Sequence, residues 1–289
     1  MNKQKKLLNY LGTNYKFRYN SASMVTDVAK IEGKEDLKYV RLDNKYLKKI
    51  AYEAAIEIDT GFSERMTADL INVVLAVEFN PFHEYFEKLK FNPDRKCVAG
   101  TIELLSKTII SENEDFTETL FNWMVNSISN IYSPVGCQND QCLTLRGSSG
   151  VGKSSWINNL CPPDLLTYKK VLNFFPVPNP NKDFLMFLNN SFIIELDGIN
   201  QSESNYAKYA SYLRQGDFDM RIPFKAEFNH FQRNANFIGS TNELYSGSGF
   251  ANNYYFPSVK VERIDFELLE TIDINQAWFE ALNEYSWTV

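Results

Sequence analysis

One glycine-rich stretch constrains this chain more than any other, because it lies between an expected strand and an expected helix. The apolar run from Gln141 to Leu145 predicts a buried strand, and the residues up to Leu160 can form a helix. The stretch comprises Gly147, Ser148, Ser149, Gly150, Val151, Gly152, Lys153 and Ser154, and Ser155 follows it. Such a loop curls so that several N–H groups and a helix N-terminus point at one anion. The pattern predicts a phosphate-binding loop.

This loop predicts particular contacts with a nucleotide. Lys153 is expected to reach the β- and γ-phosphates, and the hydroxyl of Ser154 is expected to bind Mg²⁺. The other residues from Gly147 to Ser155 are expected to surround the phosphates. The alternative is a chance glycine turn. It is disfavoured because the chain has only 13 glycines in 289 residues and both flanks of the stretch fit.

Two later apolar runs also end in polar side chains. The run from Ser191 to Gly198 predicts a strand that carries Glu195 and Asp197, and a second predicted strand ends at Asn242. Parallel strands bring their carboxyl ends to one edge of a sheet, where ligands bind. We therefore expect one of the two acids to order Mg²⁺ and the other to polarise water, with the assignment left open. The alternative is an ordinary strand end with two solvated acids. Asn242 is a candidate hydrogen-bond partner of the γ-phosphate or the attacking water.

Charge and cysteine content narrow the class of protein. The formal net charge is -6, but residues 1–50 carry 12 Lys or Arg against 5 Asp or Glu. A basic N-terminal segment in a chain whose remainder is acidic is compatible with two interpretations: it contacts nucleic acid, or it is simply a solvent-exposed charged face. The four cysteines lack paired metal-ligand spacing, which favours free thiols in a reducing compartment. No apolar run reaches membrane-spanning length and no signal core is present, so we expect no membrane partner and a cytoplasmic location.

Helical and strand periodicity predicts an α/β protein in two parts. Residues 1–135 are expected to form a mainly helical N-terminal domain, with a strand over Tyr15–Tyr19 and a helix from Ser63 to Val77. Residues 136–289 are expected to form a phosphate-loop domain with a central parallel sheet, after a hinge at 134–136. The Asn- and Pro-rich residues 164–191 predict an irregular segment.

Taken in chain order, the motifs resemble the virulence-associated protein E family, whose ATPase core is similar to superfamily 3 helicases of the AAA+ type. The phosphate loop alone is common to many proteins, whereas the ordered set is specific. The resemblance extends from about Tyr15 to the end of the chain. It rests on residues 15–20, 80–89, 147–154, 192–197, 219–224, 233, 237–242 and 273–282. Within this set, Asn242 occupies the position of the family's sensor asparagine.

The resemblance implies an ATPase that uses ATP and Mg²⁺ and is encoded by a phage or another mobile element in a bacterial host. Such proteins are often linked to a primase and replicate the element, so a primase or another replication protein is an expected partner. Relatives of the superfamily form rings that move on DNA, so we expect a homo-oligomer, with a hexameric ring as one option, and single-stranded or forked DNA as its partner. ATP then lies between subunits, and an arginine of the neighbouring subunit stabilises charge on the γ-phosphate.

Two departures from the family pattern bear on activity. The family usually has a second acid directly after Asp197, where this chain has Gly198. It usually has an Arg-Arg pair before an aromatic-Pro pair, but residues 249–257 contain no arginine. Either Arg221 or Arg233 then supplies the arginine, or hydrolysis is slow. The leading expectation is a replicative helicase. The alternative is a nucleotide-gated binding or interference protein that docks on a replication partner.

Overall fold

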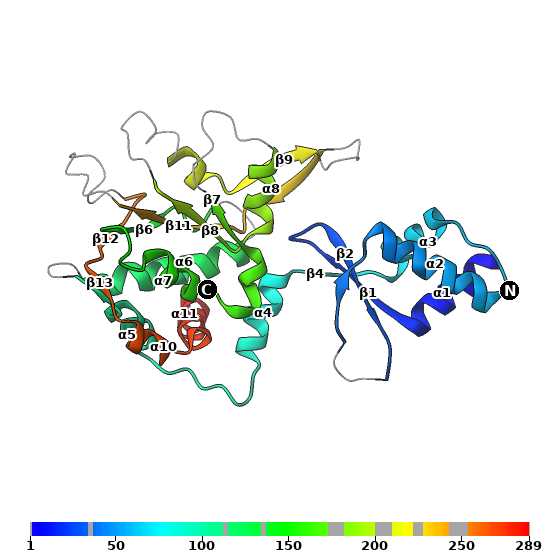
Figure 1. Ribbon diagram of the computed structural model, residues 1–289, viewed down its shortest axis with the longest axis horizontal. Helices are drawn as coiled ribbons and strands as arrows, with labels where there is room; N and C mark the ends of the chain where they lie inside the picture. The colour runs from blue at the N-terminus through cyan, green and yellow to red at the C-terminus, as the bar shows by residue number, and fades with distance from the viewer. Residues whose placement is uncertain are drawn as a thin grey trace. The chain divides into compact units, whose positions relative to one another are not determined.

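The computed structural model describes residues 2–33, 37–111, 115–133, 137–172, 182–199, 210–221, 228–242 and 254–288. The chain divides into two compact units, residues 1–81 and 82–289 (Figure 1). The division lies between Pro81 and Phe82 and not at the predicted boundary after residue 135. The segment that was expected to end the first domain therefore belongs to the second unit. The predicted hinge at 134–136 lies outside the described residues.

The N-terminal unit combines helices with a four-stranded sheet whose strand order is β3-β2-β1-β4. β1 pairs antiparallel with β2 and parallel with β4. The sequence predicted a mainly helical domain with one strand, so the four-stranded sheet is larger than expected. β1 confirms the expected strand at Tyr15. The elements are α1 Lys3–Asn14, β1 Tyr15–Asn20, β2 Val25–Lys30, β3 Val40–Arg41, α2 Asn44–Ile58, α3 Glu64–Leu70, η1 Ile71–Leu75 and β4 Val77–Phe79.

Side-chain caps and one apolar cluster explain these helices. The carboxylate of Asp43 accepts a hydrogen bond from the backbone N–H of Tyr46 at 2.7 Å, and the hydroxyl of Ser63 accepts one from Met66 at 3.2 Å. The predicted helix start at Ser63 is confirmed. The helix ends earlier than expected, because a π-helical turn follows at 71–75 and the chain becomes extended at Val77. The cluster joins one face of β1 and β2 to all three helices, through residues that include Leu7, Phe17, Val28, Ile50 and Ile71.

The second unit is built around a five-stranded parallel sheet with strand order β12-β6-β11-β8-β7. Every neighbouring pair is parallel, which confirms the predicted α/β class. Its elements are α4 Pro81–Lys90, α5 Thr101–Lys107, β5 Ile109–Ile110, α6 Thr117–Tyr132, β6 Cys142–Arg146, α7 Lys153–Leu160, η2 Pro163–Tyr168, β7 Lys169–Leu172, α8 Lys182–Asn190, β8 Ile193–Asp197, β9 Asp217–Arg221, β10 Phe228–Gln232, β11 Asn236–Thr241, β12 Ser258–Lys260, β13 Arg263–Ile264, α10 Phe266–Glu270 and α11 Ile274–Thr288.

The prediction that residues 164–191 are irregular was wrong for much of the segment. The edge strand β7 and the helix α8 lie within it, and β7 pairs with β8 through the register Lys169↔Ile193. Residues 173–181 lie outside the described chain. A strand of four residues between a 3₁₀ turn and an Asn-Pro run has too little apolar periodicity to be recognised locally.

Three buried tryptophans connect helices to the rest of this unit. The indole N–H of Trp123 on α6 donates to the carbonyl of Phe237 on β11 at 3.1 Å, and that of Trp278 on α11 donates to the carbonyl of Leu160 at 2.9 Å. Trp156 on α7 is equally buried. α6, α7 and α11 lie on the same side of the sheet (Figure 1). Among the described residues, every helix is too short or too polar to cross a lipid bilayer.

Candidate nucleotide-binding site

The glycine-rich loop connects the end of β6 to the start of α7, as the sequence predicted. Gly152 precedes α7 with a φ of 96°, and a Cβ there would lie 2.6 Å from the Cζ atom of Phe266. Both the backbone conformation and the close packing therefore require glycine. α7 has no side-chain cap and no acidic residue in its first turn. Its first N–H groups are thus suited to an anionic ligand.

Lys153 lies at the centre of the loop with a buried side chain. Its ammonium group donates to the carbonyls of Gly147 and Ser148, both at 2.8 Å, and to the Oδ1 atom of Asn242 at 3.1 Å. Burial lowers the pKa of Lys153, and the nearby charge of Asp197 acts in the opposite direction. The structure therefore brings the predicted lysine and the predicted sensor asparagine together, at the carboxyl ends of β6 and β11.

Asp197 completes this cluster at the end of β8. β8 and β11 pair in the register Asp197↔Ser240, and the hydroxyl of Ser240 donates to the Asp197 carboxylate at 2.8 Å. The Asp197 side chain is otherwise exposed. Ser240 was not singled out from the sequence. A serine inside an apolar strand gives no local signal, and only the register places it beside the acid.

Glu195 has surroundings that differ from those of Asp197. It is 2% exposed and forms an ion pair with Lys169 of β7. Lys169 also donates to the Oδ1 atom of Asn158 on α7, so it links two strands to the loop helix. The two acids predicted to share the metal and water roles are thus separated: Asp197 faces the loop, and Glu195 is neutralised inside the fold. Lys169 was missed because its segment was expected to be irregular.

The residues present fit a magnesium-bound nucleotide. Ser154 is exposed in the first turn of α7, and Asp197 supplies a carboxylate at the neighbouring strand end. Mg²⁺ prefers a few hard oxygen ligands and keeps waters and phosphate oxygens for the others. Among the described residues, no group of three or more His, Cys, Asp or Glu forms a metal cage. The Ser154 hydroxyl and the Asp197 carboxylate therefore suit a metal that is also coordinated by phosphate oxygens, rather than a metal held by protein ligands alone.

Comparison with known proteins places the chain in a family. Residues 98–288 match the model of the virulence-associated protein E-like domain. The chain belongs to the virulence-associated protein E-like family. No curated protein sequence matches it. Among solved structures it is similar to the apo NrS-1 C-terminal region (305–718), with 11% identity, a TM-score of 0.53 and coverage of 98% of this chain and 69% of that one. A second form of that region gives 11% identity, a TM-score of 0.50, and coverage of 96% and 68%. At this identity the likeness concerns the fold.

In this virulence-associated protein E-like chain, the two candidate arginines have very different positions. Arg221 ends β9 and is exposed, whereas Arg233 is fully buried. Arg233 donates to the carbonyl of Leu213 at 2.6 Å, to that of Asn139 and to the Sγ atom of Cys137. Burial lowers the pKa of Arg233. An arginine enclosed in this way cannot reach the nucleotide of a neighbouring subunit without unfolding its surroundings, so this geometry argues against the trans role considered for it.

Gly198, which stands where the family usually has a second acid, lies in a turn. Gly198 has a φ of 68°, in the left-handed region that favours glycine. The next residue, Ile199, donates its backbone N–H to the carbonyl of Ser240 at 3.1 Å and packs tightly over Gly239. A side chain at 198 would therefore strain the backbone directly beside Asp197. The other departure, at residues 249–253, lies outside the described chain, as does the end of the 219–224 motif.

The four cysteines are free. Cys97 is exposed, whereas burial raises the pKa of Cys142 and that of Cys161 to about 12. The buried thiols are therefore protonated at neutral pH and behave as small apolar side chains.

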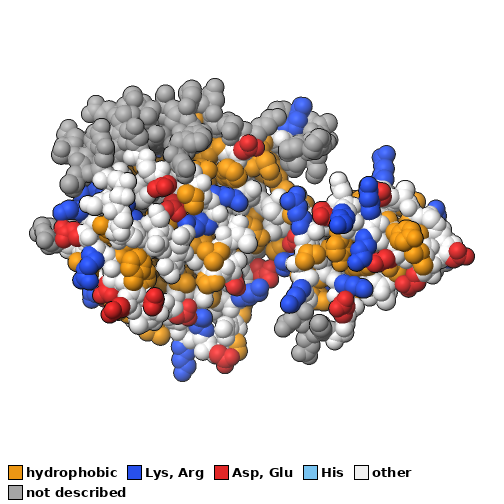
Figure 2. All heavy atoms as spheres, viewed as in Figure 1, with side chains coloured by type: hydrophobic (Ala, Val, Ile, Leu, Met, Phe, Trp, Pro, Cys, Tyr) orange, Lys and Arg blue, Asp and Glu red, His pale blue; other side chains and the backbone are white. Residues whose placement is uncertain are grey.

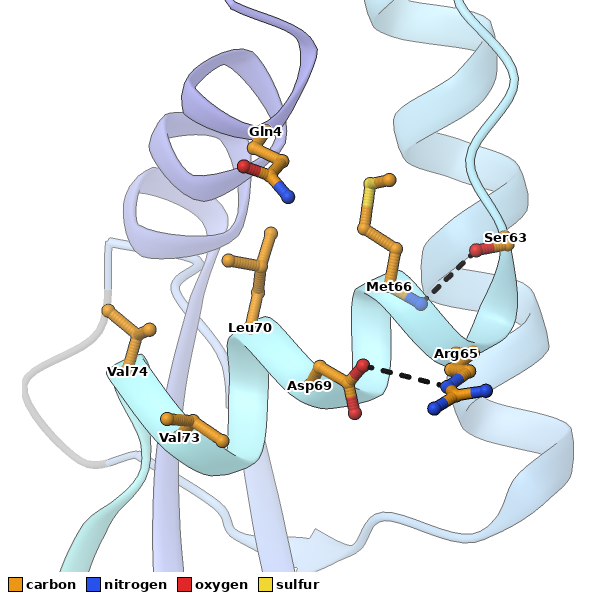
Figure 3. Close-up of a pocket in the computed structure, with 8 residues that line it drawn as sticks. All are labelled: Gln4, Ser63, Arg65, Met66, Asp69, Leu70, Val73 and Val74. Atoms are coloured by element: carbon orange, nitrogen blue, oxygen red, sulfur yellow. Dashed lines mark hydrogen bonds and ion pairs between the residues drawn. The ribbon is translucent and has the colours of Figure 1, made fainter.

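The N-terminal unit has a hollow of its own, with a volume of about 410 Å³, between α1 and the α3–η1 stretch (Figure 3). Leu70 points toward Gln4 across it, and Val74 lies at its edge. The charged residues of its lining, Arg65 and Asp69, pair with each other at 4.0 Å. The hollow thus offers no uncompensated charge to a phosphate or a metal.

The separation of the two acids leads to a paired prediction. Asp197→Asn is expected to lower ATP hydrolysis by about 10²-fold or more, because the lost charge faces the loop, while leaving the melting temperature nearly unchanged. Glu195→Ala is expected to lower the free energy of unfolding by about 3–5 kcal/mol, because it leaves Lys169 buried without its carboxylate. Urea unfolding and steady-state hydrolysis separate the two effects.

A double variant provides the matched control. Lys169→Met combined with Glu195→Leu removes both charges and is expected to regain most of the lost stability. If folded Glu195→Gln protein loses as much hydrolysis as Asp197→Asn, then Glu195 acts in the chemistry and the separation of roles is wrong.

Proposed function

We propose that this protein is an ATP- and Mg²⁺-dependent oligomeric ATPase that acts on DNA, a superfamily 3-type replicative helicase of a phage or mobile element. One observation carries the proposal: Lys153 meets Asn242 and the loop carbonyls at the carboxyl ends of parallel strands, with Asp197 beside it. Membership of the virulence-associated protein E-like family supports it, and so does the fold shared with the NrS-1 region.

When bound, Mg²⁺ would supply positive charge that offsets the negative charge of the phosphates. The N–H groups of α7 and the ammonium of Lys153 hold the phosphates, and to do so Lys153 exchanges its contacts with the Gly147 and Ser148 carbonyls for phosphate oxygens. Ser154 and Asp197 are the residues that would hold the metal. Asn242, released from Lys153, is placed to hydrogen-bond the γ-phosphate or the attacking water.

The assembly belongs to the same proposal. ATP lies between subunits of a homo-oligomeric ring, with a hexamer as one option, and the neighbour supplies an arginine. Of the two candidates, Arg221 is the exposed one. The expected partners are single-stranded or forked DNA and a primase or other replication protein, in the cytoplasm of a bacterial host.

A second function is favoured by the turn at Gly198. Without a second acid beside Asp197, water activation is weak, and a chain that binds ATP yet hydrolyses it slowly can act as a nucleotide-gated binding or interference protein. In that case nucleotide binding would control docking on a replication partner rather than movement along DNA.

The deciding experiment measures ATP hydrolysis by the purified protein with and without single-stranded DNA. Hydrolysis that rises with DNA supports the motor. Binding of ATP without turnover, unaffected by DNA, would exclude the helicase and favour the gated binding protein. Failure to bind ATP at all would reject both.

A further inference from the structure

Helices cover one face of the sheet in the N-terminal unit, and the other face carries charged and aromatic side chains. Tyr15, Phe17 and Val28 point into the apolar cluster with α1, α2 and η1. Side chains alternate along a strand, so the residues between them point to the opposite face. The register pairs Lys16 with Ala29 and Arg18 with Asp27, and it pairs Asp27 with Arg41. These residues therefore share the second face.

Two aromatic rings lie on this second face. The guanidinium carbon of Arg18 lies 4.0 Å from the ring centroid of Tyr39 and 4.0 Å from that of Phe79. The Asp27 carboxylate lies 3.4 Å from the Nε atom of Arg18. A cation held between two rings fixes their orientation. Tyr39 and Phe79 are both partly exposed.

The charge of this face favours an anionic partner. This face holds Arg18 and two exposed cations, Lys16 and Arg41, and the carboxylate of Asp27, which lies on it among the described residues, already pairs with Arg18. Burial raises the pKa of Asp27, and the two arginines oppose that shift. The acid on β4, Glu78, pairs with Tyr19 and so points to the helix-covered side. Figure 2 shows Lys and Arg side chains on this unit, with Asp and Glu side chains among them.

We infer that this face, defined by Lys16, Arg18, Tyr39, Arg41 and Phe79, binds single-stranded nucleic acid. Exposed cations contact the phosphates, and the ring pair stacks on bases, which is how sequence-independent single-strand binders combine charge and stacking. An unstacked strand offers both groups at once, whereas duplex DNA hides its base faces. The inference rests on the DNA-acting part of the proposed function, and it names the surface that this function uses in addition to the nucleotide site.

The test measures binding of a fluorescein-labelled 20-nucleotide oligo(dT) to the full chain by anisotropy over a range of salt concentrations. Lys16→Glu with Arg41→Glu is expected to weaken binding at least tenfold. It should also lower the slope of log K against log salt by about 1.4, since each phosphate contact on a single strand contributes about 0.7. Tyr39→Leu is expected to weaken binding at least about fivefold without changing the slope, because it removes stacking alone.

A matched charge reversal controls for net charge. Lys5 on α1 and Lys45 on α2 are exposed on helices that cover the other face. Lys5→Glu with Lys45→Glu is expected to change the affinity less than twofold. Far-ultraviolet circular dichroism of each variant shows that the unit has folded.

The outcomes separate this inference from the proposed function. If wild-type protein binds oligo(dT) and the Lys16/Arg41 reversal binds equally well, the inference is overturned and a DNA-acting ATPase still stands. If wild-type protein hydrolyses ATP but binds no oligo(dT), both the inferred binding surface and the proposed action on DNA are rejected. Binding of a labelled poly-glutamate peptide in place of oligo(dT) would assign the face to an acidic protein and overturn the inference.

Discussion

Lys153→Ala is expected to abolish ATP binding at micromolar nucleotide and reduce hydrolysis at least a hundredfold. The lysine supplies the buried cation of the loop, and its ammonium group is already poised between the Gly147 carbonyl and Asn242. Loss of two charge-assisted hydrogen bonds to phosphate corresponds to about 3–6 kcal/mol, or at least about two orders of magnitude in Kd. Titration calorimetry with ATP and Mg²⁺ measures the effect directly.

A control lysine separates this effect from a general change of charge. Lys107 on α5 is exposed and pairs with Glu103 of the same helix, so Lys107→Ala is expected to leave ATP binding unchanged. Melting curves without nucleotide report whether either variant is unfolded. Hydrolysis retained by folded Lys153→Ala protein would show that this loop is not the nucleotide site.

The pKa of Lys153 adds a pH dependence with a definite sign. Phosphate binding needs the protonated ammonium, and burial lowers the pKa of this lysine. As the pH rises, Lys153 loses its charge earlier than an ordinary lysine does. The affinity for ATP is therefore expected to fall at a lower pH than it would for an exposed lysine.

Arg233→Ala is expected to lower the free energy of unfolding by about 3–5 kcal/mol, the largest stability effect among the candidate site residues together with Glu195→Ala. The substitution removes the guanidinium donor from the carbonyls of Leu213 and Asn139, and it opens a cavity where a fully buried side chain stood. Urea unfolding followed by tryptophan fluorescence measures the loss. Arg233→Lys keeps the charge but not the forked geometry, and it should recover only part of the stability.

Arg221→Ala is the matched control for the trans role. Arg221 is exposed, so its loss should change stability by less than about 0.5 kcal/mol. If Arg221 is the arginine that reaches the neighbour's nucleotide, hydrolysis by the assembled protein should fall about 10³-fold. Arg233→Ala protein that keeps full stability and yet loses hydrolysis to that degree would reverse the two assignments.

Residues that act locally could be assigned from the sequence. The phosphate loop, its strand and its helix are contiguous, and the spacing of Gly147, Gly152 and Lys153 specifies the turn without help from distant residues. The parallel sheet was also predictable, because apolar strands ending in polar side chains are typical of α/β sites. Asn242 was placed beside the loop by this reasoning, and the structure puts it 3.1 Å from Lys153.

Roles that depend on a distant partner could not be assigned in this way. Glu195 and Asp197 are two residues apart on one strand, so alternation alone makes them equivalent. Their difference comes from Lys169, which reaches Glu195 across the sheet from a segment that has no clear periodicity. Arg233 likewise looks like an available cation in the sequence, and only its contacts with two distant segments, at Leu213 and at Cys137 and Asn139, show that it is enclosed.

The sequence by itself determined the glycine-rich loop between a strand and a helix, the α/β class and the family pattern, because each depends on residue types at short or ordered spacing. Only the tertiary structure decided which acid faces the loop, that Arg233 is enclosed, and that basic and aromatic side chains share one face of the N-terminal sheet. The physical reason is that burial, ion pairing and strand register depend on residues far away in the chain. The local sequence does not show which residues those are.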